Sequence, residues 1–408
     1  MQVGVPFQSF RECIDPNLKV LVRIDINVPI NVKEGVILDD YRIEAHAATI
    51  SKLAKSGMSV VVIAHQGRPG DDEFTSLGIH WRYLEKYAGM RVSFIEDVMG
   101  PAAQGAIRNL GPGEVLLLDN VRFVSEEVIE RSPQLQSNTF LVRRLAPLFD
   151  VFVMDAFATA HRSQPSIVGF PLVLPSCAGL VLEKELNAMN VFSSSRRESI
   201  VLAGGAKVPD TIKAISKLLA NEAAGKILVG GLVGVIFIAA KYGANGWLRK
   251  YLEESGFGGL VNDARLLLDK YGDSVAVPTD VGVEVHGDRV DVDARKIDAP
   301  VMDIGPATMD AYSSYVRGAE VAVLTGPMGV TEKKQFAEGT EAVFKAMVDD
   351  AKFTIIGGGH TIMSARKLGY IEKIKHVSTG GRAFLQFLVG EELPALQALA
   401  ESKRRFWK

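Results

Sequence analysis

Residues 19–29 read KVLVRIDINVP, an apolar run that ends abruptly in charged and polar residues. The first part of the chain continues with similar runs, SVVVIA at 59–64, EVLLL at 114–118 and VFVM at 151–154. Short apolar runs without polar alternation are typical of strands buried on both faces. Because helical patterns separate these runs, they predict a parallel sheet that helices cover on both sides.

The second part of the chain repeats this organisation. Its apolar runs are SIVLA at 199–203, KILVG at 226–230, EVAVL at 320–324 and FTII at 353–356, again with helical patterns between them. The sequence therefore predicts an α/β protein with two doubly wound, Rossmann-like parallel-sheet lobes.

A helical pattern, LVLEKELNAMN at 180–190, follows two prolines and a glycine and precedes a serine-rich exit. We interpret it as a hinge helix between the lobes. The expected organisation is an N-terminal lobe at 1–175, a linking helix at 176–192, a C-terminal lobe at 193–385 and a final segment at 386–408.

The composition argues against a polyanionic partner. The chain has 408 residues, 47% hydrophobic and 23% charged, with a formal net charge of −2. This length predicts two or three domains. Since nucleic-acid binding usually brings a basic excess, we expect no nucleic acid as a partner. We also expect no membrane partner. Any anion site must be a local concentration of cations.

The location in the cell is expected from the cysteines and the first residues. Cys13 and Cys177 suggest neither a metal cluster nor a disulfide framework, which favours a reducing cytoplasm. The stretch MQVGVPFQSFRECIDPN lacks the pattern of a signal peptide. The uncharged run ILVGGLVGVIFIAA at 227–240 has 14 residues, fewer than the roughly 20 that span a bilayer. We expect a buried strand, a glycine turn and a buried helix there.

Ligands of doubly wound sheets lie beyond the carboxyl ends of the strands. In the first half these ends carry RIDINVP, HQGRPG, DNVRF and DAFATAHRS, and an arginine begins the first helix. Any one of these side chains is more simply a solvated cation or, for Asp25, Asp119 and Asp155, a cap. Repetition at four strand ends instead predicts a site for a small, multiply anionic ligand, because arginine matches phosphate and carboxylate oxygens. For Arg23, inside a strand, we expect a structural ion pair with Asp25.

The equivalent positions of the second half are rich in glycine: AGGAKVPDT, GGLVG, TGPMGVTE and GGGHT. Glycine allows close approach of a backbone to a ligand, and a helix N-terminus presents free N–H groups to phosphate. Lys207 adds a compact positive charge. These features predict a nucleotide-binding half, although neither common nucleotide fingerprint is present and glycine pairs also occur at ordinary turns.

Together, the segments resemble the phosphoglycerate kinase family, and especially its archaeal branch, over nearly the whole chain. The motifs that carry the resemblance occur in the family's order: VLVRIDINVPI, DDYRIEAHAATI, HQGRPG, LLLDNVRF, DAFATAHRSQPS, AGGAKV, DIGPATMDAY, TGPMGVTE, IIGGGHT and HVSTGG. The resemblance implies a hinged two-lobed kinase that transfers a phosphoryl group between 1,3-bisphosphoglycerate and ADP, in line, after hinge closure.

The resemblance also implies the residues of the glycerate site. Asp25 and Asn27 are expected at the glycerate hydroxyl and carboxylate, and Arg42 at the transferred group as well as the substrate. The remaining expected substrate contacts are His65, Gln66, Gly67, Arg68, Arg122 and Arg162.

On the nucleotide side, the resemblance implies that Lys207 neutralises the transferred group and that Glu332 accepts the ribose hydroxyls. The other expected nucleotide contacts are Gly205, Gly230, Gly231, Gly357, Gly358, Gly359, His360 and Thr361. Magnesium is expected to come with ATP or ADP. The final segment is expected to return to the N-terminal lobe.

Departures from the family's pattern lie mostly on this nucleotide side. Many members carry Asp, a magnesium ligand, where His360 stands, and Mg²⁺ prefers oxygen, so we assign no direct metal ligand. Many also carry Asn at Thr325 and a second Lys at Thr211, and Arg382 interrupts their usual glycine triplet.

Two alternatives are weighed against the kinase. One is a dinucleotide-dependent oxidoreductase of similar fold, against which the missing fingerprint argues. The other is a non-catalytic binding protein derived from the kinase, which Thr325, His360 and Arg382 motivate. The expected partners are the substrates alone, bound to a monomer or small homo-oligomer.

Overall fold

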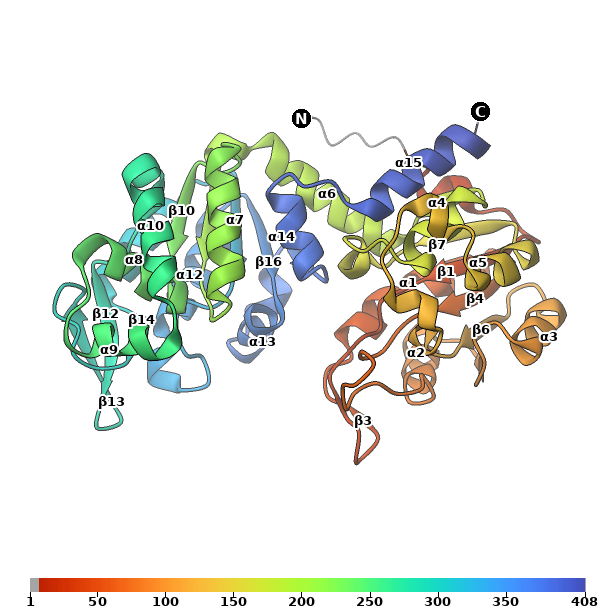
Figure 1. Cartoon of the computed structure of the whole chain (residues 1–408), viewed down its shortest axis with the longest axis horizontal. Helices are drawn as coiled ribbons and strands as arrows, with labels where there is room; N and C mark the ends of the chain where they lie inside the picture. The colour runs from red at the N-terminus through yellow and green to blue at the C-terminus, as the bar shows by residue number, and fades with distance from the viewer. Residues whose placement is uncertain (1–6, 408) are drawn as a thin grey trace. The chain divides into compact units, whose positions relative to one another are not determined.

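The computed structural model describes residues 7–407; residue 408 and residues 1–6, part of the stretch considered for a signal peptide, lie outside the described residues. The chain divides into two compact units (Figure 1). The N-terminal unit comprises residues 7–187 and 392–407 of the described chain, and the C-terminal unit comprises 188–391.

A six-stranded sheet with the order β5-β6-β4-β1-β7-β8 forms the centre of the N-terminal unit. All its neighbouring strands are parallel. Its strands are β1 (Lys19–Arg23), β4 (Ser59–Ile63), β5 (Val92–Ile95), β6 (Val115–Leu118), β7 (Val151–Met154) and β8 (Ser176–Ala178). The chain leaves β1 toward β4 and later returns to β7 on the other side of β1, so the strand order reverses at β1. Such a reversal is where ligands bind in doubly wound sheets.

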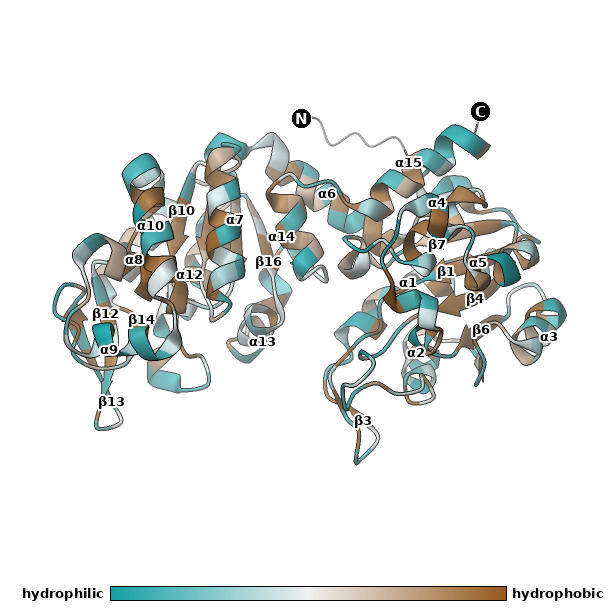
Figure 2. Cartoon of the chain, viewed as in Figure 1, coloured by the Kyte–Doolittle hydropathy of each residue, from teal (hydrophilic) through white to brown (hydrophobic). Residues whose placement is uncertain are grey.

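Helices and a small hairpin surround this sheet. The hairpin pairs β2 (Ile30–Asn31) with β3 (Val36–Ile37). The helices are α1 (Tyr41–Lys55), α2 (His80–Ala88), α3 (Pro101–Asn109), α4 (Pro133–Gln136), α5 (Phe140–Leu145) and α15 (Pro394–Phe406). The sheet strands are the most hydrophobic part of the unit (Figure 2). β4, for example, is buried at every position, which explains its unbroken apolar sequence.

The C-terminal unit has its own six-stranded parallel sheet, with the order β11-β10-β9-β15-β16-β17. Its strands are β9 (Ser199–Ala203), β10 (Lys226–Val229), β11 (Val275–Ala276), β15 (Val321–Thr325), β16 (Phe353–Gly357) and β17 (His376–Ser378). An antiparallel sheet accompanies it, made of β12 (Asp280–Val285), β13 (Asp288–Asp293) and β14 (Val301–Ile304). The prediction of two parallel α/β sheets is confirmed.

The helices of the C-terminal unit include the one expected from the long apolar run. They are α7 (Val208–Ala220), α8 (Gly231–Tyr242), α9 (Gly246–Ser255), α10 (Gly258–Tyr271), α11 (Pro306–Val316), α12 (Glu338–Asp350), α13 (Gly359–Lys367) and α14 (Arg382–Leu388). The run at 227–240 forms β10, a turn at Gly230 and α8, as predicted. Among the described residues, no helix is both long and apolar enough to cross a membrane.

Two helices lie where the chain leaves the N-terminal unit and where it returns to it. Helix α6 (Leu180–Ser194) begins in this unit and continues into the other. Helix α15, close to the C-terminus, packs on the N-terminal unit (Figure 1). The Ala395 amide donates to the Ala160 carbonyl at 3.1 Å, and Ser402 Oγ donates to the Leu174 carbonyl at 3.0 Å.

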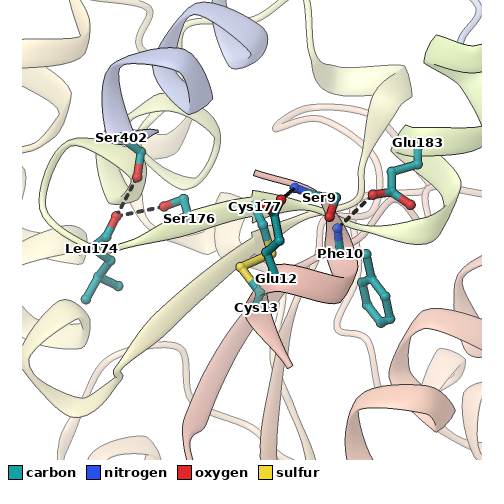
Figure 3. Close-up of a disulfide and its surroundings, with 9 residues drawn as sticks. All are labelled: Ser9, Phe10, Glu12, Cys13, Leu174, Ser176, Cys177, Glu183 and Ser402. Carbon is teal, nitrogen blue, oxygen red and sulfur yellow. Dashed lines mark hydrogen bonds between the residues drawn. A yellow bond between two sulfur atoms is a disulfide. The ribbon is translucent and has the colours of Figure 1, made fainter. Parts of the chain in front are cut away.

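The cysteines differ from the expectation. Cys13, in the short helix η1 (Phe10–Cys13), and Cys177, in β8, form a disulfide (Figure 3). The expectation of no disulfide was wrong because 164 residues separate the two cysteines, and only the folded sheet brings them together. Beside the disulfide, Glu183 of α6 accepts a hydrogen bond from the Phe10 amide at 2.7 Å. The bridge and this bond fasten η1 to β8 and to α6.

Candidate active site

The carboxyl ends of the strands around β1 gather the polar residues expected from the sequence. Asp25 follows β1, His65 follows β4, Arg122 follows β6 and Arg162 follows β7. Arg42, at the second position of α1, reaches back to the same edge through its contact with Asp25. Parallel pairing of the strands places these four ends side by side.

Asp25 holds Arg42 in place. Its Oδ2 accepts a hydrogen bond from Arg42 Nη1 at 2.7 Å, and the same nitrogen donates to the Asn27 carbonyl at 3.1 Å. The Asp25 side chain is 1% exposed and that of Arg42 is 29% exposed. Asn27 in turn accepts a bond from the Gly67 amide through Oδ1 at 2.8 Å. The guanidinium is therefore anchored on one side and open to solvent on another.

Cations dominate the electrostatics of this edge. Burial, and next the charge of Arg162, lower the pKa of Arg122 to about 10. The charges of Arg23 and Arg68 also act on it in the same direction. Mutual repulsion of this kind requires the guanidinium groups to lie near one another. Several positive charges lie close together at this site, which suits an anion with more than one charged group.

His65 lies inside this cluster and is buried. Burial, followed by the charges of Arg23, Arg122, Arg162 and Arg42, lowers its pKa well below the usual value. The imidazole is therefore neutral at physiological pH.

Arg23 does not pair with Asp25 as expected. It donates through Nε to Ser166 Oγ at 2.9 Å, through Nη1 to the Ile24 carbonyl, and through Nη2 to His65 Nδ1 at 3.0 Å. Asp25 is occupied by Arg42 instead. The two residues lie only two positions apart, Arg23 at the end of β1 and Asp25 just after it, which suggested pairing. The buried Arg23 instead bonds the adjacent Ile24 carbonyl and the side chains of His65 and Ser166.

The residues after His65 have different environments. Gln66 is fully buried and exchanges hydrogen bonds with the Val28 backbone through Oε1 at 3.0 Å and Nε2 at 2.9 Å. Gly67 has φ +63°, and a Cβ there would lie 2.5 Å from the Glu73 carbonyl oxygen. Gln66 and Gly67 therefore shape the loop, while the neighbouring Arg68 is exposed.

Asp155 links the site to α6. Its Oδ2 lies 2.8 Å from Nδ1 of His46, a fully buried residue one turn after Arg42 on α1. Its Oδ1 accepts bonds from the amides of Val181 at 2.8 Å and Leu182 at 3.3 Å. Asp155 is thus a cap of α6, one of the alternatives weighed from the sequence, and it joins α1 to that helix.

In the C-terminal unit, the glycine-rich turns pack on one another. Amides of Gly204, Gly205 and Gly231 donate to carbonyls of residues 325, 327 and 328, each at 2.8 Å. A Cβ at Gly230 would lie 2.4 Å from Met328 Sδ. A Cβ would also lie 2.3 Å from the Pro327 carbonyl oxygen at Gly204 and 2.7 Å from the Gly205 amide nitrogen at Gly231. Close packing therefore accounts for glycine at 204, 230 and 231, and the sequence pattern alone could not distinguish it from contact with a ligand.

Unlike these packed turns, the first turn of α13 has an open glycine position, at Gly359. Gly358 has φ +95°, but a Cβ added to Gly359 would meet nothing within 4 Å. Gly359 and His360 are exposed, whereas Thr361 is buried and accepts a bond from the Gly326 amide at 2.8 Å. A helix leaves its first N–H groups without intrahelical partners, so the open face at Gly359 offers donors suited to phosphate.

Lys207 stands at the N-cap of α7 with an exposed side chain. Its carbonyl accepts a bond from Thr211 Oγ1 at 3.0 Å, so the threonine is used within the helix. Arg382 lies 3.8 Å from Asp210 of the same helix. Glu332 is exposed. Within the described part of the chain, no three His, Cys, Asp or Glu side chains are placed to hold a metal ion.

Two further residues, Glu127 and Ser166, support the site. Glu127 is fully buried, and Ser166 donates to its Oε1 at 2.5 Å through Oγ and to its Oε2 at 3.0 Å through the amide. Neither residue stands directly after a strand of the parallel sheet. No signal in the sequence distinguishes Glu127 from the partly exposed Glu126 beside it.

A family model described as phosphoglycerate kinase matches residues 15–391. The chain belongs to the phosphoglycerate kinase family. It is 48% identical over 400 residues to the phosphoglycerate kinase of Pyrobaculum aerophilum, covering 98% of this chain and 97% of that protein. It is 49% identical over 388 residues to the enzyme of Sulfurisphaera tokodaii, covering 93% and 92%. The crystal structure of phosphoglycerate kinase from Pyrococcus horikoshii matches with a TM-score of 0.89 and 38% identity, covering 98% of this chain and all of that one.

These matches confirm the resemblance, including its archaeal character, and the enzyme class. The chain is a kinase that transfers a phosphoryl group between 1,3-bisphosphoglycerate and ADP. The oxidoreductase alternative is thereby set aside.

Proposed function

We propose that the cation cluster of the N-terminal unit binds 3-phosphoglycerate, and 1,3-bisphosphoglycerate in the reverse direction. The observation that carries this assignment is the convergence of four arginines on the buried, neutral His65. A substrate with a phosphate and a carboxylate at opposite ends needs several directed donors, which guanidinium groups supply.

Within this proposal, Arg42 and Asp25 face the reacting end of the glycerate. Arg42 is held by Asp25, so it would meet developing charge without first having to reorient. Asn27 would contact the glycerate hydroxyl and carboxylate region with Asp25. Arg122, Arg162 and the exposed Arg68 would bind the phosphate, with His65 donating a hydrogen bond.

The nucleotide would bind the C-terminal unit at the turns after β9, β10, β15 and β16. Gly205, Gly230 and Gly231 would form the floor of the adenine site, and Glu332, which is exposed, would accept the ribose hydroxyls. The first turn of α13, from Gly357 to Thr361, would bind the phosphates through backbone N–H groups. Lys207 would neutralise the transferred group.

Magnesium would enter with ATP or ADP and neutralise phosphate charge. The first turn of α13 offers backbone donors and the imidazole of His360, and Mg²⁺ prefers oxygen ligands. These residues fit phosphate oxygens and do not fit the metal, so no residue of this turn is assigned to hold the ion.

Transfer in this scheme needs no general base. A β-phosphate oxygen of ADP attacks the acyl phosphorus, and the bond from phosphorus to the carboxylate oxygen breaks. Nucleophile and leaving group are both already ionised, so no proton has to move. The protein contributes alignment, positive charge and exclusion of water, which Arg42 and Lys207 would provide.

Each substrate would have its own lobe, at 1–175 and 193–385, joined by a linking helix at 176–192 and by the segment at 386–408. Because neither lobe would contain a complete site, hinge closure would precede transfer. We further propose a monomer or small homo-oligomer in the cytoplasm. The disulfide does not exclude that location, because disulfides also occur in intracellular proteins of hyperthermophiles.

A coupled assay tests the function directly. Purified protein supplied with ATP and 3-phosphoglycerate should produce ADP at a rate that depends on both substrates. Lys207→Ala should abolish most of the rate, while Lys270→Ala, on α10 of the same unit, should leave it unchanged. Nucleotide binding without turnover would instead favour the non-catalytic alternative.

A further inference from the structure

His65 and Arg23 form a hydrogen bond whose direction is fixed by chemistry. Arg23 Nη2 lies 3.0 Å from His65 Nδ1. A guanidinium group stays protonated in proteins and has only donors. His65 must therefore accept through Nδ1, and its ring proton is on Nε2.

The other groups around His65 favour the same state. Arg122, Arg162 and Arg42 add positive charge from η2 (Val121–Phe123), from the segment after β7 and from α1. The nearby carboxylate is Asp25, whose Oδ1 lies 3.9 Å from Nδ1. That distance is too long for a hydrogen bond, and Asp25 is engaged by Arg42. A second ring proton would point at the Arg23 guanidinium.

Arg23 is itself held on its other side. Its Nε donates to Ser166 Oγ at 2.9 Å, and Ser166 Oγ donates to Glu127 Oε1 at 2.5 Å. Arg23 and Glu127 are both buried, so the carboxylate balances the guanidinium charge within the fold. A lysine could not replace Arg23, because one ammonium group cannot reproduce the fixed fork that meets Ser166 and His65 together.

We propose that Arg23 is a positioning residue that keeps His65 as the neutral Nε2–H tautomer, so that His65 is a directed hydrogen-bond donor to a substrate anion and not a titrating cation. The part that concerns the substrate rests on the proposed glycerate site. A neutral donor offers the substrate a directed hydrogen bond. While the site is empty, it adds no positive charge that would repel the arginines. It also keeps this contact constant between about pH 5 and 8, where an ordinary histidine changes charge.

Nitrogen–proton correlation spectra of the histidine rings in the full-length protein test the tautomer without any need for activity. His65→Gln identifies the His65 signals among the seven histidines. We expect a protonated Nε2 and a bare Nδ1 that stay unchanged from about pH 5.5 to 8. Protonation of both nitrogens within that range, or a proton on Nδ1, would overturn the proposal.

The double variant Arg23→Met with Glu127→Gln tests the role of Arg23, since it removes the guanidinium and its counter-charge together. His65 should then begin to take up a second proton as the pH falls. The ratio of the variant's KM for 3-phosphoglycerate to that of the wild type should therefore rise by about tenfold from low to high pH. The reason is that the bond from His65 to the substrate is charge-assisted at low pH and neutral at high pH. An unchanged tautomer and KM profile would show that Arg23 does not set the state of His65. If the variant fails to fold, the wild-type spectra still decide whether His65 is the Nε2–H tautomer that the proposal requires.

Titration of the wild type with 3-phosphoglycerate separates this inference from the proposed function. The His65 Nε2 signal should shift on saturation. Binding without any such shift would remove the donor role, whereas absence of binding would contradict the proposed glycerate site and leave the tautomer unaffected.

Discussion

Cys13 and Cys177 are bonded to each other across 164 residues of sequence, and their disulfide fastens the start of the described chain to the edge strand β8. A covalent loop of that length lowers the entropy of the unfolded chain. The chain-entropy relation gives an upper figure of about 5 kcal/mol.

The double variant Cys13→Ser with Cys177→Ala should therefore lower the free energy of unfolding of the N-terminal unit by several kcal/mol in urea titrations. A matched measurement is thiol titration of the denatured wild type without reductant, in which we expect no free thiol. Detection of both thiols would contradict the disulfide.

The open face at Gly359 leads to the next prediction. A Cβ there would meet nothing within 4 Å, so we expect Gly359→Val to fold with wild-type stability and to lose most nucleotide binding through obstruction of the phosphates. His360→Ala should keep substantial activity, because the proposed contact is through the backbone.

Gly258→Val is the matched control, since Gly258 also begins a helix and its Cβ would lie in open space. Nucleotide affinities from calorimetry, with unfolding curves for each variant, make the comparison. The assignment of α13 fails if Gly359→Val binds ADP like Gly258→Val, or if His360→Ala alone abolishes binding.

His80 gives the N-terminal unit a predictable pH dependence. Its Nε2 donates to Gln66 Oε1 at 3.0 Å, and burial lowers its pKa to about 4. Between that value and the unfolded pKa near 6.5, the unfolded chain binds a proton that the folded chain does not. Stability from this residue is therefore present above pH 6.5 and declines as the pH falls, by about 1.4 kcal/mol per pH unit.

In urea titrations between about pH 5 and 7, His80→Gln should lower the slope of the unfolding free energy against pH by the contribution of one proton. The amide of glutamine can donate to Gln66 without titrating. The exposed His286→Asn should leave the slope as it is. Equal slopes for wild type and His80→Gln would refute the burial effect.

The sequence predicted what depends on local pattern. Apolar runs located the central strands, and the run at 227–240 predicted β10 and α8. Because parallel strands share one edge, the residues after the strands also predicted where Asp25, His65, Arg122 and Arg162 would gather.

What the sequence could not predict depends on tertiary contact. The side-chain partners of Arg23 are at positions 65 and 166, and neither is near it in sequence. Gly205 and Gly230 were expected at the nucleotide, and the sequence could not predict that both also pack against residues 326–328. Burial of Glu127 likewise depends on the segment around Ser166.

Calorimetric titration with 3-phosphoglycerate, in the absence of nucleotide, shows whether the cation cluster of the N-terminal unit binds this substrate. Arg162→Ala should weaken binding by about 1.5–3 kcal/mol, or roughly 10–100-fold in Kd, through loss of a charge-assisted contact. Arg108→Ala, exposed on α3 of the same unit, should bind like the wild type. An Arg162→Ala protein with wild-type Kd would show that the proposed glycerate site is wrong.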